Sequence, residues 1–267
     1  MASGPAKRLS RVSTRIRRVT TRTHIALSRM QGKRIVHLLH IGKTGGSVIK
    51  DALQPHVTAG HYVITLNPHR ITLRDVPAGD CVVFFLRDPL TRFVSGFYSR
   101  QRKGQPRSYS EWNAAEQEAF AYFDSPNALA VALSARGEAE KARAVRAMQG
   151  IRHVADSYWK WFESEEYYLS RLSDIFFVGF QESLAADFET LKARLELPGS
   201  IQLTSDPIKS HKNPGHLDYS LDDIAVENLK NWYKNEWRLI RLCQDAAAQG
   251  RITVGGKPAG CRGVNEA

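Results

Sequence analysis

Uninterrupted apolar runs mark three strands along the chain. Residues 34–41 (RIVHLLHI), 81–86 (CVVFFL) and 175–180 (IFFVGF) are short and rich in β-branched or aromatic side chains. Such runs are typical of strands that a parallel sheet buries on both faces. Residues 57–66 form a weaker candidate for a fourth strand.

Helical patterns fill the intervals between these runs. Asp88 and Pro89 suit the N-cap and the first helical position, so a helix is expected over 89–100. Strands that alternate with helices predict a single α/β domain, in which helices flank a central parallel sheet to give three layers. Further amphipathic helices are expected within 109–171, over 182–195 and, as one long final helix, over 221–248.

Basic residues are concentrated at the N-terminus. Residues 1–34 hold ten of the 38 Lys and Arg side chains and none of the 27 Asp and Glu side chains. The remainder, with 28 basic and 27 acidic residues, is nearly neutral, which argues against nucleic acid as a partner. We expect a flexible basic extension over 1–33, the folded domain over 34–250 and a C-terminal tail over 251–267.

The basic segment has more than one interpretation. It lacks the apolar core of a secretory signal, but its Arg, Ser and Thr content also fits an organelle transit peptide. A solvated, disordered extension and an electrostatic contact with an anionic membrane are the other interpretations. The three cysteines are scattered, and no run of about 18 apolar residues exists that could span a membrane. We expect a cytoplasmic protein, with peripheral membrane contact through this segment as an open alternative.

A glycine-rich loop, GKTGGS over residues 42–47, lies between the first strand and a helical pattern. At such a turn, backbone N–H groups and the positive end of the helix dipole create an anion site. A Walker A loop would need a glycine five residues before Gly42, where the chain has His37. The loop therefore suits one phosphate group better than a triphosphate. Its ligating candidates are Lys43, Thr44, Gly45, Gly46 and Ser47.

A second motif, RDPLTRFVS over residues 87–95, follows the second apolar run directly. Arg87 stands at the carboxyl end of the predicted strand, where open α/β sheets bind ligands. Ser95 and Arg92 share a face of the helix, three residues apart. A guanidinium can grip a phosphate with two hydrogen bonds, and a serine hydroxyl can add a third. Arg92 has the alternative role of bracing the loop.

Together the two motifs resemble those of the sulfotransferases that use 3′-phosphoadenosine-5′-phosphosulfate, especially the carbohydrate enzymes and their bacterial relatives. The chain has HIGKTGGS where that family has H-I-P-K-T-G-G-T/S, and it keeps R-D-P-x-x-R-x-x-S intact. Gly42 replaces the family's proline. The resemblance implies a P-loop-like fold, with residues 43–47 on the 5′-phosphosulfate and Arg87 and Ser95 on the 3′-phosphate. It also implies an acceptor hydroxyl on a carbohydrate, such as a polysaccharide or glycolipid, and no metal.

Catalysis in this family implies two further roles. Lys43 would neutralise the charge that builds on the departing phosphate, and a histidine between the motifs would take the acceptor's proton. His69 is our candidate for this base, ahead of His61 and His56. Two alternatives to the sulfotransferase stay open: a nucleotide-dependent kinase of the same α/β class, and a non-enzymatic polyanion-binding protein that acts through its basic segment. Lys209 and Lys212, in a late loop, are additional candidates for the 3′-phosphate.

Overall fold

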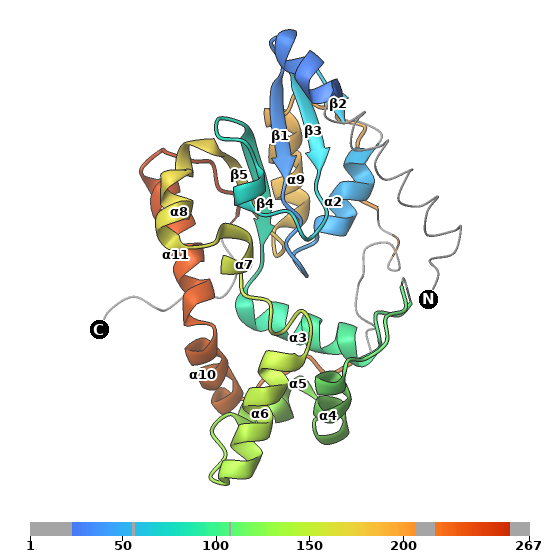
Figure 1. Cartoon of the computed structure of the whole chain (residues 1–267), viewed down its shortest axis with the longest axis vertical. Helices are drawn as coiled ribbons and strands as arrows, with labels where there is room; N and C mark the ends of the chain where they lie inside the picture. The colour runs from blue at the N-terminus through green and yellow to red at the C-terminus, as the bar shows by residue number, and fades with distance from the viewer. Residues whose placement is uncertain (1–22, 55–56, 107, 205, 207–216, 257–267) are drawn as a thin grey trace, which may run out of the picture.

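A five-stranded sheet forms the centre of the protein (Figure 1). The computed structural model describes residues 23–54, 57–106, 108–204, 206 and 217–256. The strand order is β2-β3-β1-β4-β5, in which all neighbours run parallel except β2, which pairs antiparallel with β3 at one edge. The predicted α/β class with a parallel central sheet is therefore confirmed. The strands are β1 (Arg34–Leu38), β2 (Thr58–Ala59), β3 (Tyr62–Leu66), β4 (Cys81–Leu86) and β5 (Ile175–Phe180).

Strand β4, which lies between β1 and β5, explains why the sheet is the middle of three layers. All six of its residues are buried, and successive side chains point to opposite faces. Val82 and Phe84 belong to one hydrophobic cluster with α7 (Trp159–Phe162), α8 (Glu165–Ser170) and α11 (Lys234–Ala248). On the opposite face, β4 shares a cluster with α2 (Gly46–Leu53) and α9 (Leu184–Arg194).

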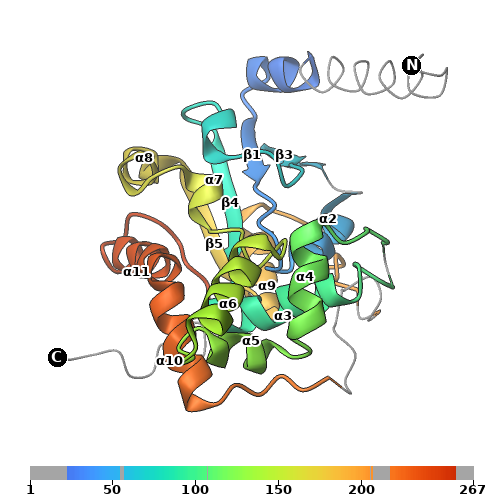
Figure 2. The same ribbon diagram turned by 60° about the horizontal axis from the view of Figure 1, so that its bottom comes forward.

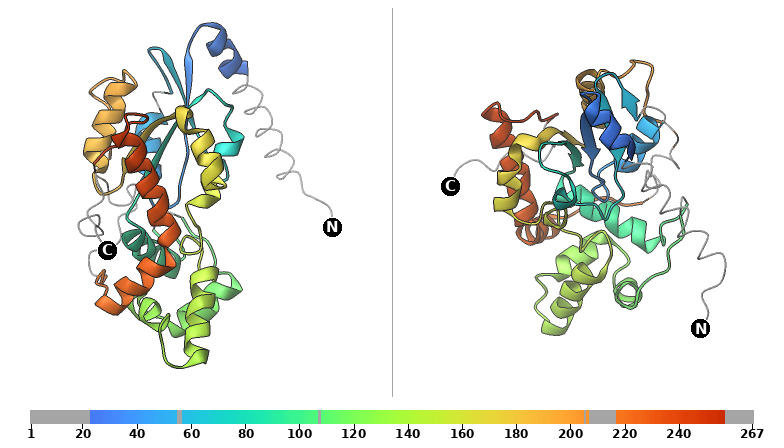
Figure 3. Two further views of the ribbon diagram at one scale, coloured as in Figure 1. Left: turned by 90° about the vertical axis from the view of Figure 1, so that its left-hand side faces the viewer. Right: turned by 45° about the horizontal axis from the view of Figure 1, so that its top comes forward.

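A separate helical lobe lies beyond the carboxyl ends of the strands. Figures 2 and 3 show its helices grouped at that end of the molecule, most of them within the long crossover from β4 to β5. The lobe has a hydrophobic core of its own, to which Phe93, Phe97 and Met148 contribute. Its helices are α3 (Pro89–Gln101), α4 (Ala114–Tyr122), α5 (Pro126–Ala132), α6 (Glu138–Gly150) and α10 (Asp223–Trp232). Short 3₁₀ turns, η2 (Leu73–Asp75) and η3 (Leu172–Asp174), precede β4 and β5.

Helix α3 begins as its sequence predicts. The Asp88 side chain accepts hydrogen bonds from the backbone N–H groups of Leu90 (2.8 Å) and Thr91 (3.0 Å), and Pro89 occupies the first turn. These bonds satisfy two of the N–H groups that a helix start leaves without an intrahelical partner. The start of α3 is thereby fixed at the carboxyl end of β4, which places its next turns against the loop that follows β1.

The single long final helix was a wrong prediction. It divides at Tyr233, whose φ of −97° and ψ of 23° lie outside the helical range, into α10 and α11. Tyr233 is buried, and its hydroxyl donates to the carbonyl of Val154 (3.1 Å). The two helices serve different cores, since α10 packs in the lobe and α11 packs on the sheet. A straight helix could not cover both.

Contacts with the sheet and its neighbouring loops continue past both predicted boundaries of the folded domain. Residues 23–30 are helical, and Arg29 forms an ion pair with Asp80 (2.5 Å). At the other end, Val254 forms a parallel bridge with Val178 of β5, so the chain beyond residue 250 continues on the edge of the sheet. Residues 1–22 and 257–267, the outer parts of the predicted extension and tail, lie outside the described residues. Among the helices that the structure describes, none is both long and apolar enough to cross a membrane.

Candidate active site

A cavity of about 910 Å³ opens at the carboxyl edge of the sheet. Its walls include one residue or more from the segment after each parallel strand: Lys43 after β1, His69 after β3, Arg87 after β4 and Glu182 after β5. Ser95 of α3 faces it from the lobe. The chain leaves β1 toward β3 and later returns to β4 on the other side, so the cavity lies at a switch point of the topology, where such sheets bind ligands.

The loop after β1 has the backbone geometry of an anion site. Gly45 caps α2 with a left-handed φ of 85°, and α2 has no side-chain cap on its amino end. A Cβ atom on Gly46 would lie 2.4 Å from the His40 ring, so only glycine fits there. Gly45, Gly46 and Ser47 all line the cavity. The amino end of α2 thus borders the cavity.

Thr44 differs from its neighbours in the loop. Its side chain is buried, and its hydroxyl donates to the carbonyl of Ile41 (3.1 Å) rather than lining the cavity. The Thr44 hydroxyl, which the sequence suggested as a ligand, is therefore committed to the shape of the loop.

Lys43 is surrounded by other cations. Burial, and after it the positive charges of Arg87, Arg102 and Arg92 in that order, lower its pKa to about 7. A bound anion would raise the pKa of Lys43 again, because it would supply the opposite charge that the ammonium group lacks. The loop is thus electrostatically suited to an anion.

Arg87 is held at the rim of this loop. The hydroxyl of buried Tyr158 accepts from the Arg87 backbone N–H (3.0 Å) and donates to its carbonyl (2.6 Å). Its side chain donates through Nε to Thr91 (3.0 Å) and through Nη1 to the carbonyl of Lys43 (3.5 Å). Burial lowers the pKa of the Arg87 guanidinium. The carboxylate of the neighbouring Asp88 caps α3.

The open question of Arg92 is answered by its contacts. Its Nε donates to the carbonyl of Gly42 (3.0 Å), and its guanidinium lies over the Tyr158 ring, 4.5 Å from the centroid. Arg92 is buried and does not line the cavity. It braces the start of the loop, while Ser95, one turn further along α3, borders the cavity.

Of the three candidate bases, the structure brings His69 into the cavity. Its Nδ1 lies 2.8 Å from the carbonyl of His40, and the two rings stack with centroids 3.7 Å apart. Because a carbonyl can only accept, Nδ1 carries the proton of the neutral ring and Nε2 has the free lone pair. Burial lowers the pKa of His69, which keeps the ring neutral at physiological pH. His61 is exposed and paired with Glu196 (3.1 Å), away from the cavity.

Three candidates cannot be placed in this site: His56, Lys209 and Lys212 lie outside the described residues. Conversely, Glu182 and His153 line the cavity although neither was a candidate from the sequence. Glu182 accepts from the Asp88 backbone N–H (3.0 Å) and the Thr91 hydroxyl (3.2 Å). Its place directly after a buried strand was the signal that could have found it, whereas His153 lies in the lobe and offers no such signal.

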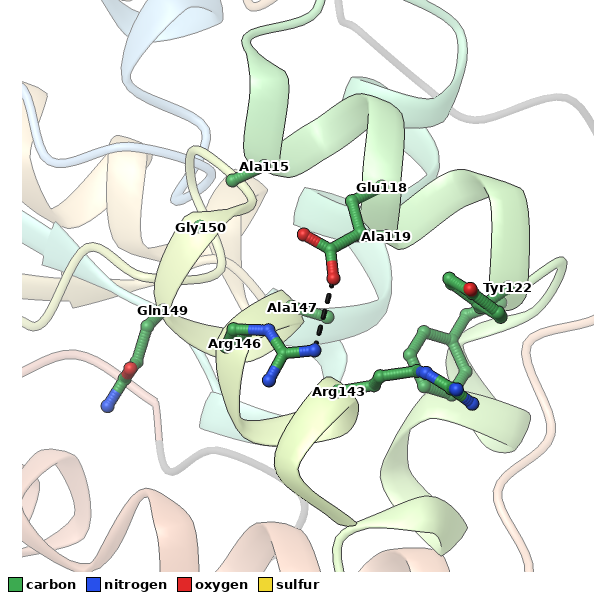
Figure 4. Close-up of a pocket in the computed structure, with 10 residues that line it drawn as sticks. Ala115, Glu118, Ala119, Tyr122, Arg143, Arg146, Ala147, Gln149 and Gly150 are labelled. Carbon is green, nitrogen blue, oxygen red and sulfur yellow. Dashed lines mark hydrogen bonds and ion pairs between the residues drawn. The ribbon is translucent and has the colours of Figure 1, made fainter. Parts of the chain in front are cut away.

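A smaller hollow of about 220 Å³ lies within the lobe, between α4 and α6 (Figure 4). Arg146 points across it to Glu118 (3.1 Å), and Arg143 lies over the Tyr122 ring. Its remaining walls are Ala115, Ala119, Ala147, Phe123, Gln149 and Gly150. No segment that follows a strand reaches it. The hollow is therefore not part of the site at the sheet edge.

Comparison with protein-family models, with curated proteins and with solved structures found no match for this chain. The resemblance to sulfotransferases consequently stays a prediction from two motifs.

The lowered pKa of Lys43 predicts how anion affinity depends on pH. Below about pH 7 the ammonium is charged with or without an anion, so affinity should be flat. Above that value the free protein loses the proton and the complex keeps it, so affinity should fall by up to about tenfold per pH unit. Equilibrium titration with sulfate, whose charge is constant from pH 6 to about 9, measures this. Lys43→Arg, which stays charged, should abolish the slope; a slope unchanged in that variant would contradict the assignment.

Proposed function

We propose that this protein is a sulfotransferase with a P-loop-like fold, which moves a sulfuryl group from 3′-phosphoadenosine-5′-phosphosulfate to a hydroxyl of a carbohydrate acceptor, such as a polysaccharide or glycolipid. One observation carries the proposal. Lys43 and Ser47 of the first motif, and Arg87 and Ser95 of the second, border a single cavity at the ends of the neighbouring strands β1 and β4. Two anion-binding groups of residues in one cavity suit a ligand with two separated phosphates.

The proposed reaction needs only groups that border this cavity. The acceptor oxygen attacks sulfur in line, and the bond from sulfur to the oxygen of the 5′-phosphate breaks. The products are a sulfate ester and 3′-phosphoadenosine 5′-phosphate. Lys43 faces the negative charge that develops on the departing phosphate oxygen, and Nε2 of His69 takes the acceptor's proton.

Two titrations and a transfer assay test the proposal. Incubation with donor labelled in its sulfate, and with a panel of polysaccharides and glycolipids, should give a labelled acceptor. Titration with 3′-phosphoadenosine 5′-phosphate and with ATP separates the proposal from the kinase alternative. Tight binding of ATP with no binding of the bisphosphate would favour the kinase.

The polyanion-binding alternative rests on the basic N-terminal segment alone. Deleting residues 1–22 removes seven of its basic side chains. An enzyme should keep its nucleotide affinity after this deletion, whereas a binder that acts through the segment should lose its salt-sensitive affinity. The proposed cytoplasmic location, with the segment in contact with an anionic membrane, is tested by binding of the two forms to vesicles that contain phosphatidylserine.

Replacing His69 with alanine should lower kcat by about 10²–10⁴-fold, because the acceptor's proton would lose its base. The affinity for 3′-phosphoadenosine 5′-phosphate should change little, since that nucleotide carries no reacting hydroxyl. His61→Ala is the matched control: its ring is exposed beside Glu196, so turnover should be unaffected. Near-normal turnover of His69→Ala would mean that another group is the base.

A further inference from the structure

His153 reaches the cavity from the lobe. It follows α6, lines the cavity together with Lys43 and His69, and is electrostatically coupled to both. The proposed reaction gives it no task. In the proposed reaction the transferred group passes from the departing phosphate at Lys43 to the acceptor at His69, and His153 lines the same cavity.

The backbone at His153 is held in an unfavourable conformation. Its φ of 69° lies in the left-handed region. This conformation is unfavourable for a residue that has a side chain but not for glycine. Helix α3 accommodates this turn at Gly96, where a Cβ atom would lie 3.3 Å from the His153 carbonyl carbon. Strain of this kind persists only where the surrounding structure imposes it. Here it directs the imidazole toward the loop after β1.

The loop in turn leaves room for the ring. A Cβ atom on Gly42 would lie 3.5 Å from Nδ1 of His153 and 3.9 Å from the Trp161 ring, so a side chain larger than alanine would compete with the imidazole for space. Gly42 is the position at which this chain departs from the proline of the motif it resembles. Gly42 and His153 are therefore complementary neighbours, the absence of a side chain at one leaving room for the ring of the other.

The ring is also kept uncharged. Burial, and after it the charge of Lys43, lower the pKa of His153 to about 3. A neutral imidazole always carries one N–H, so it can donate a hydrogen bond to an anion without adding another cation to an already crowded site.

From this geometry we infer that His153 binds the sulfuryl group of the donor, donating a hydrogen bond to one of its oxygens beside Lys43. The inference rests on the proposed function. It makes the lobe, and not only the edge of the sheet, a source of contacts to the transferred group. His153 thereby distinguishes the sulfated donor from the product nucleotide, which lacks that group.

Calorimetric titration of 3′-phosphoadenosine-5′-phosphosulfate and of 3′-phosphoadenosine 5′-phosphate, without acceptor, tests the inference. His153→Gly is the deletion of choice, because glycine relieves the left-handed backbone while removing the ring. It should bind the sulfated donor about 10–100-fold more weakly than the wild type and the product nucleotide equally well. His153→Asn, which tolerates this backbone and keeps an N–H donor, should recover most of the loss.

The outcomes separate two failures. If the wild type binds neither nucleotide, the proposed function is wrong and the inference with it. If the wild type binds both, but His153→Gly weakens both equally or neither, only the inference is overturned, and His153 merely supports the loop through Gly42. Loss confined to the sulfated donor, with recovery in His153→Asn, supports the inference.

Discussion

Replacing Lys43 with methionine is expected to abolish sulfuryl transfer and to raise the melting temperature of the protein at pH 6. Transfer should fall by about 10³-fold or more, because the phosphate oxygen that leaves sulfur loses the cation that faces its developing charge. The charged ammonium group, however, lowers the free energy of unfolding, since burial and three neighbouring guanidinium groups lower its pKa to about 7. Removing the ammonium group should raise the melting temperature by about 2–4 °C for each kcal/mol gained in the free energy of unfolding.

The opposite signs of these two effects make the result specific. A lysine that only stabilised the fold would lower both activity and melting temperature when replaced. The thermal gain should shrink as the pH rises from about 7 toward 10, because the wild-type lysine then loses its proton in the folded state. Lys230→Met, at an exposed position of α10, should change neither quantity. Transfer by Lys43→Met within a few-fold of the wild type would contradict the role given to Lys43.

Arg87→Ala is expected to remove the preference for a 3′-phosphate. The wild type should bind 3′-phosphoadenosine 5′-phosphate far more tightly than adenosine 5′-phosphate, since only the former reaches Arg87 and Ser95. A bidentate contact to a phosphate contributes two hydrogen bonds to a charged group, so the variant should bind the bisphosphate about 10²–10³-fold more weakly. Its affinity for adenosine 5′-phosphate should change far less, because Lys43 and Ser47 remain and Lys43 loses only the long bond from Arg87 Nη1 to its carbonyl (3.5 Å) and a neighbouring charge.

Titration of both nucleotides against both proteins measures this selectivity. Arg74→Ala is a suitable control, because Arg74 is exposed and paired with Glu163 outside the cavity. Equal weakening of the two nucleotides by Arg87→Ala would assign Arg87 to the 5′-phosphate or to the fold. The residues that bind the 3′-phosphate would then lie elsewhere.

The apolar pattern predicted the sheet because burial of a strand on both faces leaves a distinct signature. The run CVVFFL became β4, and the Asp88-Pro89 pair became the start of α3. Parallel strands place their carboxyl ends at the same edge of a sheet. The sequence alone therefore predicted that Lys43 and Arg87 lie close together, although they belong to different segments. These inferences needed only local composition and the direction of the strands.

Other features depended on contacts that no local pattern records. The hydroxyl of Thr44 turns inward because the carbonyl of Ile41 lies within reach, a fact of loop conformation rather than of residue type. The final helix breaks at Tyr233 because its two halves pack in different hydrophobic cores. His153 enters the cavity from the lobe, whose position against the sheet follows from tertiary packing alone.

In the proposed complex, two groups of residues bind the two phosphates of one nucleotide. The most direct test is a crystal structure of the protein with 3′-phosphoadenosine 5′-phosphate. The account predicts the 5′-phosphate within hydrogen-bonding distance of Lys43 and the backbone of residues 45–47, and the 3′-phosphate on Arg87 and Ser95. Both phosphates gathered at one end of the cavity, or the nucleotide bound away from the carboxyl ends of β1 and β4, would contradict it.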